Sequence, residues 1–236
     1  MLLSFDGKVY LAQAGATPAV AGESDEVETA TKIANPAQAD AAFFALLVKA
    51  EGMTNEYKKA PLLKSIIKQL PLSNVTSKNM EKMFLGPILS MIINLNNKKA
   101  LTACLSAIFS TFKYGQSKAK SSFQIIKPAM LTALIEAAAT FINIKNDEGT
   151  AAAILEDALT NLANAGVSGS NTSPYLRQIL NKAKTLKSPT LKNELFATCY
   201  KKISLTIKQP ADRENIFIAE GLGDTYQKLL KGQKLN

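Results

Sequence analysis

Two cysteines, Cys104 and Cys199, are the most distinctive reactive residues in this sequence of 236 residues, and they lie in similar apolar stretches. Paired thiols of this kind could anchor a covalently attached prosthetic group, each from its own helix, although a small buried thiol is the ordinary arrangement. The chain has no CxxC spacing and too few cysteines for a disulfide framework. We therefore predict no metal site and no cofactor, and keep as the alternative a helical bundle that binds an apolar ligand between its helices or a pigment attached covalently through Cys104 and Cys199.

Histidine is absent from the sequence. Its absence removes the commonest general base, the usual partner of a Ser or Cys nucleophile and the commonest zinc ligand. The run Glu220-Gly-Leu-Gly-Asp resembles the first half of a dinucleotide-binding turn. Tyr226 stands where the third glycine would be, and no βαβ pattern surrounds the run, so it predicts a break between helices. We predict that the protein is not an enzyme.

Charge is distributed unevenly along the chain, which has a formal net charge of +9. Residues 1–52 hold 3 lysines and 7 acids, residues 53–146 hold 13 lysines and 3 acids, and residues 147–236 hold 12 basic residues and 9 acids. A strongly basic middle segment favours contact with a polyanion or with an acidic protein surface, because uncompensated charges repel one another on a compact body. The middle segment is therefore the predicted interaction region.

The candidate partner-binding residues are the lysines of this segment, namely Lys58, Lys59, Lys64, Lys68, Lys78, Lys82, Lys98, Lys99, Lys113, Lys118, Lys120 and Lys127. Interleaved aromatic residues could stack on bases, namely Tyr57, Phe112, Tyr114 and Phe123. The competing interpretation is that the lysines form an ordinary solvated face and that the aromatic residues belong to the core. Only Arg177 and Arg213 are arginines, and lysine suits diffuse, salt-sensitive attraction better than base reading.

The N-terminal region differs in pattern from the remainder. Two β-prone runs, 2–5 and 8–11, flank Asp6-Gly7, a dipeptide typical of two-residue hairpin turns. An Ala-, Gly- and acid-rich stretch to Pro36 follows, which predicts a flexible acidic arm with at most one weak helical turn. We therefore divide the chain into residues 1–35, a hairpin and arm, and residues 36–236, a helical domain that could comprise two subunits, 36–146 and 147–236.

From Pro36 onward, apolar residues recur at helical spacing. The pattern, with its Asn-Pro and Ser-Pro starts and its Gly and Pro stops, predicts an all-α fold of eight or nine helices stacked as antiparallel hairpins. The predicted helices span about 36–51, 55–70, 77–95, 98–114, 121–144, 147–165, 173–187, 188–208 and 210–230, with bends at prolines such as Pro87 and a possible interruption at 221–223.

No run offers about 20 uninterrupted apolar residues, so we predict no transmembrane insertion and a soluble, intracellular protein. A weaker possibility is an amphipathic segment, 84–95, that enters a membrane surface. The favoured hypothesis is a non-enzymatic helical scaffold or assembly protein, a homo- or hetero-oligomer whose basic segment 53–146 contacts an acidic protein assembly or the backbone of a nucleic acid, as in a nucleocapsid. The N-terminal hairpin and arm would tether neighbouring subunits.

Overall fold

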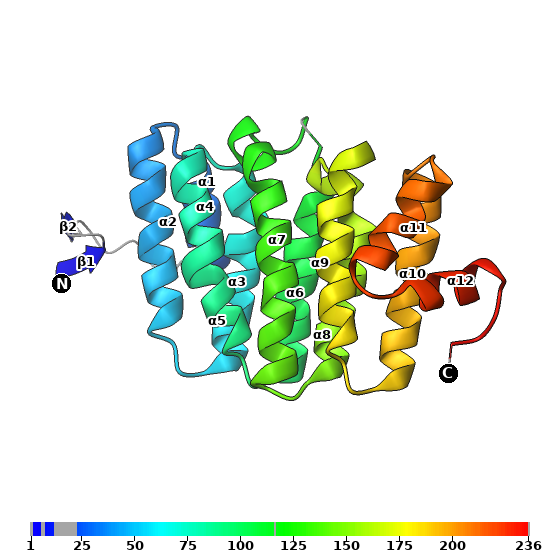
Figure 1. Cartoon of the computed structure of the whole chain (residues 1–236). Coiled ribbons are helices and arrows are strands. Elements are labelled where there is room, and N and C mark those ends of the chain that lie inside the picture. The colour runs from blue at the N-terminus through cyan, green and yellow to red at the C-terminus, as the bar shows by residue number, and fades with distance from the viewer. Residues whose placement is uncertain (1, 6–7, 12–22, 116, 236) are drawn as a thin grey trace.

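The computed structural model describes residues 2–5, 8–11, 23–115 and 117–235. Residues 23–115 and 117–235 form an all-α body (Figure 1), which confirms the predicted class. The elements in chain order are β1 Leu2–Phe5, β2 Lys8–Leu11, α1 Glu23–Thr31, α2 Pro36–Glu51, α3 Glu56–Gln69, η1 Leu70–Leu72, α4 Ser77–Met83, η2 Phe84–Ile88, α5 Leu89–Ile93, α6 Lys98–Phe112, α7 Ser121–Asn143, α8 Glu148–Asn161, η3 Ala163–Ala165, η4 Gly169–Asn171, α9 Thr172–Lys184, α10 Pro189–Thr206, α11 Pro210–Ala219 and α12 Gly223–Leu230.

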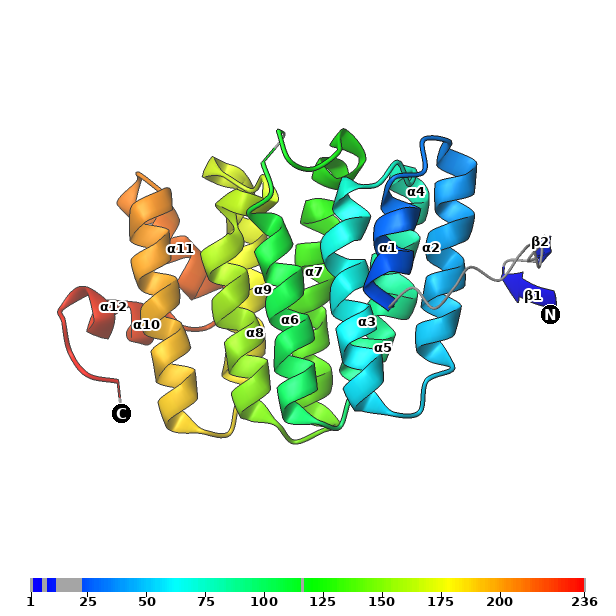
Figure 2. The same cartoon turned by 180° about the vertical axis from the view of Figure 1, so that it is seen from behind.

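The helices form two layers that run side by side along the molecule (Figures 1 and 2). One layer contains α2, the continuous rod α4–η2–α5, α7, α9 and α11, and the other contains α1, α3, α6, α8 and α10. Successive helices alternate between the layers as antiparallel hairpins, and α12 packs on α10 and α11. Each hairpin contacts mainly its neighbours, so the body is an elongated helical stack of the solenoid kind.

Polar residues at the helix starts explain where most of these elements begin. The side chains of Asn35, Asn55, Thr76, Asn97, Asp147 and Ser188 accept a hydrogen bond from a backbone N–H in the first turn of α2, α3, α4, α6, α8 and α10. Each such cap satisfies a donor that the helix itself leaves unpaired. Proline occupies the first turn of α2, α10 and α11, where the missing N–H costs nothing.

The acidic segment contains more helix than the sequence predicted. Where at most one weak turn was expected, α1 extends over nine residues and buries Val27 and Ala30 against α2 and α3. The Glu26 carboxylate also pairs with Lys49 Nζ of α2 at 2.7 Å. The prediction of a flexible arm is therefore wrong for 23–31, because an apolar pair one turn apart gives this short helix a packed face.

At the N-terminus, the backbones of β1 and β2 pair antiparallel, with Leu2 opposite Leu11 and Phe5 opposite Lys8. The predicted turn at Asp6-Gly7 and the remainder of the predicted arm, 12–22, lie outside the described residues. The hairpin as a docking element therefore stays a prediction.

Eleven continuous helices occur in the described residues, against the predicted eight or nine, because α1 is a helix and because the last predicted helix is two. Gly221 divides α11 from α12: it adopts a φ of +70°, and the N–H groups of Gly221 and Leu222 close the end of α11 on Ile218 and Phe217 carbonyls. The Gly-Leu-Gly run is thus a helix break. At the predicted bend, Pro87 lies in the π-helical turn η2, where a missing N–H interrupts the regular ladder.

One hydrophobic core runs through the stack from Val27 to Tyr226. Helices α7 and α8, which adjoin the predicted boundary at 146/147, pack together closely, and Phe141 of α7 is fully buried. Among the described residues, α7 is the one helix long and apolar enough to span a membrane, yet 56% of its most apolar 18-residue stretch is buried inside the body. That burial is typical of the core helix of a folded domain.

Candidate functional site

Five of the predicted partner-binding lysines lie at one end of the helix stack, and we call them the lysine rim: Lys68, Lys78, Lys113, Lys118 and Lys120. They occupy the last turn of α3, the first turn of α4, the end of α6 and the loop before α7. Antiparallel hairpins bring these termini to the same end, at the top of Figure 1. A hydrogen bond of 3.0 Å from the Lys120 backbone N–H to the Pro71 carbonyl joins the two loops directly.

Few acidic side chains of the protein itself neutralise the positive charge of the lysine rim. All five side chains are exposed, and none forms an ion pair with another described residue. Two nearby acids have other roles. Asp40 accepts hydrogen bonds from the Thr76 backbone and the Asn79 side chain, and Asp157 has a pKa that burial and Glu156 raise, although Lys113 acts in the opposite direction. The rim therefore presents excess positive charge to solvent.

Four other predicted lysines lie at the opposite end, among acidic groups: Lys58, Lys59, Lys98 and Lys99. Lys98 Nζ lies 3.7 Å from the Asp147 carboxylate, and Lys59 Nζ donates to the Glu51 carbonyl at 3.4 Å. Glu56 accepts hydrogen bonds from the backbone N–H groups of Asn96 and Asn97. Acidic side chains therefore lie among the lysines at this end, and one of them pairs with Lys98, so this end carries less uncompensated charge than the lysine rim.

The remaining three predicted lysines are placed differently. Lys64 is exposed on the outer surface of α3, and Lys82 is exposed on α4, one turn beyond Lys78. Lys127 is only 3% exposed. Its ammonium donates to the carbonyls of Phe112 at 2.9 Å and Tyr114 at 2.8 Å, so it satisfies the carbonyls at the end of α6. Lys127 therefore cannot contact a partner on the surface, and the predicted single basic face is instead two separate ends of the stack.

The predicted stacking residues are also divided. Phe112 and Phe123 are fully buried core residues, so the prediction that they stack on bases is wrong for the folded protein. Tyr57 is 75% exposed, but it lies at the end opposite the lysine rim. Tyr114 packs partly against the core, and the ammonium of Lys118 lies 4.1 Å from the centre of its ring. Phe112 and Phe123 therefore belong to the core, as the competing interpretation expected, whereas Tyr57 is exposed and Tyr114 is partly buried.

Both cysteines are fully buried, Cys104 in α6 and Cys199 in α10. Burial raises the pKa of Cys104 to about 11, and it raises the pKa of Cys199 as well. The Cys104 thiol donates to the Ala60 carbonyl at 3.7 Å. A group attached at either sulfur would have to displace packed side chains. Covalent attachment stays a prediction that this geometry does not favour.

We expect neither thiol to react with an aromatic disulfide reagent while the protein is folded, because the reactive thiolate is suppressed and the sulfur is inaccessible. Thiol titration at pH 8 should show no fast release in native buffer and the release of two equivalents, for Cys104 and Cys199, in concentrated guanidinium. Fast release of a full equivalent from the native protein would contradict the burial of at least one thiol.

Substituting Glu56 tests how the end opposite the lysine rim is held together. Backbone N–H groups of Asn96 and Asn97 lower the pKa of Glu56 below its usual value. A lowered pKa in the folded state stabilises the protein above the ordinary carboxyl pKa, and this contribution is lost as pH falls through the folded-state pKa. Glu56→Gln should lower the free energy of unfolding by about 1 kcal/mol near neutral pH. The difference from wild type should shrink toward pH 3, and a difference that grows on acidification would contradict the assignment.

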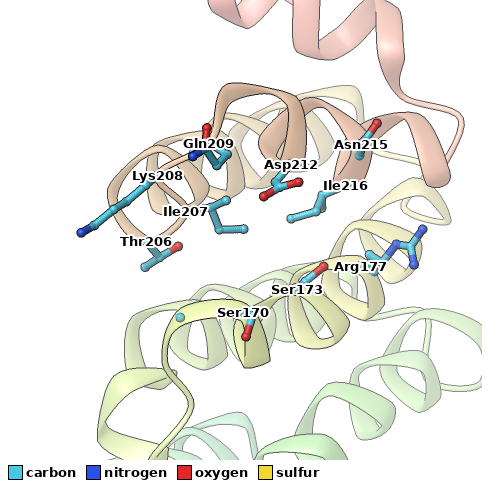
Figure 3. Close-up of a pocket in the computed structure, with 11 residues that line it drawn as sticks. Ser170, Ser173, Arg177, Thr206, Ile207, Lys208, Gln209, Asp212, Asn215 and Ile216 are labelled. Atoms are coloured by element: carbon cyan, nitrogen blue, oxygen red, sulfur yellow. The ribbon is translucent and has the colours of Figure 1, made fainter.

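A groove of about 510 Å³ opens between α9 and α11. Its lining includes Ser173 and Arg177 of α9 and Asp212 and Ile216 of α11 (Figure 3). The distribution of lysines along the sequence did not predict this groove, because the residues that line it lie outside the lysine-rich segment 53–146. The signal that could have found it is the pair of arginines in a chain that otherwise uses lysine.

Lys32, exposed between α1 and α2, was missed for a similar reason, since it lies before residue 53 but at the end of the stack that carries the rim.

No protein-family model, curated protein or solved structure is significantly similar to this chain. Its function must therefore be inferred from the positions, burial and charge of its own residues. In the described part of the chain, no group of three or more Cys, Asp or Glu side chains is arranged to hold a metal ion. The lysine rim and the α9–α11 groove are the two candidate sites.

Proposed function

We propose that this chain is a non-enzymatic helical scaffold that binds an acidic partner along the lysine rim. The observation that carries the proposal is that five exposed lysines, none in an ion pair with another described residue, lie at one end of the stack. Like charges held together on a rigid body raise its energy, and a negative partner relieves the repulsion. The elongated two-layer body supports a scaffold role, because stacked helical hairpins present extended surfaces to which a partner can bind.

The partner is either an acidic protein assembly or the phosphate backbone of a nucleic acid. Lysine provides point charges without the planar fork that reads base edges. Among the predicted stacking residues, Tyr114 is the one beside the rim, and Lys118 already covers its ring. The rim therefore fits a surface of closely spaced negative charges, recognised by charge density and without sequence reading.

Material purified from its natural source at low salt tests the proposal and distinguishes the two partners. The protein has no Trp and six Tyr, so bound nucleic acid would dominate its absorbance near 260 nm. An acidic protein partner would leave that absorbance low and add mass in native mass spectrometry. We expect one of these two signatures, lost when salt is raised into the molar range because the Debye length falls to about 3 Å. A bare monomer at low salt, from an extract that retains its acidic macromolecules, would contradict the proposal.

We further propose that the N-terminal hairpin tethers neighbouring subunits by strand addition. Because Val27 and Ala30 of α1 belong to the core, the deletion that tests this should end at residue 22. Deleting 1–22 should leave helical circular dichroism unchanged and reduce the particle size seen by light scattering. An unchanged particle size would exclude the hairpin from assembly.

A further inference from the structure

Both arginines of the chain are associated with the α9–α11 groove, one by lining it and the other through hydrogen bonds to two lining residues, although they are 36 positions apart in sequence. Arg177 lines the groove from α9. Arg213 braces its wall from α11: the Nε donates to the Ile207 carbonyl at 2.5 Å, and an Nη donates to the Lys208 carbonyl at 3.0 Å. Ile207 and Lys208 themselves line the groove. One arginine therefore shapes the wall of the cavity, and the other lies at its edge (Figure 3).

The groove has an apolar floor and polar walls. Ile207 and Ile216 are buried to 9% and 4% exposure at its base. Asp212 and Ser173 face each other across it, while Lys208 and Arg177 lie toward opposite ends (Figure 3). A volume of about 510 Å³ is within the usual range for ligand sites, which typically combine apolar walls with a few oriented polar groups.

The charged groups of the groove are not satisfied by one another. Arg177 and Asp212 are both exposed, and neither forms an ion pair or side-chain hydrogen bond within the described part of the chain. Asn171 and Gln209, which precede α9 and α11, do not cap the helices with their side chains. The side chains of Asp212 and Arg177, which have no partner among the described residues, therefore flank the apolar floor of the groove.

We propose that this groove binds an extended peptide segment of a partner protein, with an acidic side chain on Arg177 and an apolar side chain on Ile207 and Ile216. A guanidinium offers a planar fork that matches a carboxylate in two hydrogen bonds. The Asp212 carboxylate accepts the backbone N–H groups that such a peptide carries. It repels a compact polyanion such as phosphate, which is why we favour a peptide. This peptide would be one contact of the acidic partner proposed above, so the proposal rests on that function only in assuming that the partner is acidic.

The Nε–H groups of the two arginines allow peptide binding at the groove to be measured by NMR. Selective labelling with ¹⁵N-arginine gives two Nε–H signals in a chain with two arginines. The Arg213 signal should exchange slowly with water, because its Nε donates to a backbone carbonyl. The probe is the peptide acetyl-Gly-Leu-Glu-Gly-amide, and its matched control has Gln in place of Glu. With the Glu peptide at millimolar concentration, we expect both signals to shift and saturate, and the Gln peptide should give shifts several-fold smaller.

Two variants show where the peptide binds. Arg177→Gln and Lys201→Gln each remove one positive charge, the first from the groove and the second from an exposed position on α10. In Arg177→Gln the remaining Arg213 signal should lose most of its response, and in Lys201→Gln both responses should persist. Equal shifts with the Glu and Gln peptides, no shift in wild type, or an unchanged Arg213 response in Arg177→Gln would overturn the proposal.

Inorganic phosphate and the lysine rim complete the test. If phosphate at the same concentration shifts Arg177 as far as the Glu peptide does, the groove is an anion site, and the peptide assignment is wrong. A protein whose five rim lysines are replaced by Gln should retain the arginine responses, because the rim and the groove share no residue. Failure of the rim as a binding surface and failure of the groove as a peptide site therefore give different results.

Discussion

Replacing Lys127 by methionine should lower the free energy of unfolding by about 3 kcal/mol, the largest single-residue loss of stability that we expect outside the apolar core. The ammonium is buried and donates to the carbonyls of Phe112 and Tyr114. Methionine keeps the aliphatic stem but removes both hydrogen bonds, so the Phe112 carbonyl loses its ammonium donor and the Tyr114 carbonyl keeps the hydrogen bond from the Gln124 side chain at 3.1 Å. For a chain of this size, thermal unfolding should shift down by roughly 6 to 12 °C, measured by circular dichroism at neutral pH.

The matched control for this prediction is Lys113→Met at the end of α6, the helix whose last carbonyls Lys127 of α7 contacts. Lys113 is exposed and forms no ion pair within the described residues, so its replacement should change stability by no more than about 0.5 kcal/mol. Folded Lys127→Met protein should bind an acidic partner as wild type does, because the buried ammonium does not reach the surface. Wild-type stability in Lys127→Met would show that α6 does not need this ammonium.

Neutralising the lysine rim should produce the largest change in binding. Five Lys→Gln replacements at the rim should weaken binding of poly-L-glutamate and of a single-stranded DNA oligonucleotide at least tenfold at low salt, because ion release drives such binding. For the oligonucleotide, the dependence of log affinity on log salt should become shallower by roughly 3 to 4, at about 0.7 for each phosphate that the variant no longer neutralises. Fluorescence anisotropy over a salt series measures both quantities.

The chain offers a control with an equal change of net charge. Lys58, Lys59, Lys64, Lys98 and Lys99 are five lysines of the same basic segment outside the rim. Replacing these by Gln should weaken binding much less than the rim replacement does, because acids already lie among them, such as Asp147 beside Lys98. Equal losses in the two variants would mean that overall charge, and not the rim, attracts the partner.

Much of the fold could be read from the sequence because its signals are local. Caps such as Asn35 and Asn97 and first-turn prolines such as Pro189 start helices where the pattern predicts. Helix α1 was missed because its packing depends on contacts with α2 and α3, which no local pattern shows. The division at Gly221 was foreseen as an interruption, because a glycine can adopt a left-handed conformation there.

The site was harder to predict because exposure depends on the tertiary arrangement. A lysine at helical spacing reads the same whether it reaches solvent, as Lys120 does, or turns inward to carbonyls, as Lys127 does. Charge counts along the chain also cannot separate the two ends of a stack, since each hairpin contributes to both. The α9–α11 groove needed two helices that are distant in sequence, and Arg213 acts there through backbone carbonyls that have no sequence signature.

Lysine footprinting tests the central claim most directly. The protein would be acetylated briefly with and without bound poly-L-glutamate or oligonucleotide, and mass spectrometry would measure protection at each lysine. We predict strong protection at Lys68, Lys78, Lys113, Lys118 and Lys120, with little change at Lys58, Lys59 and Lys99. Uniform protection over all exposed lysines, or protection mainly at the opposite end, would contradict binding along the lysine rim.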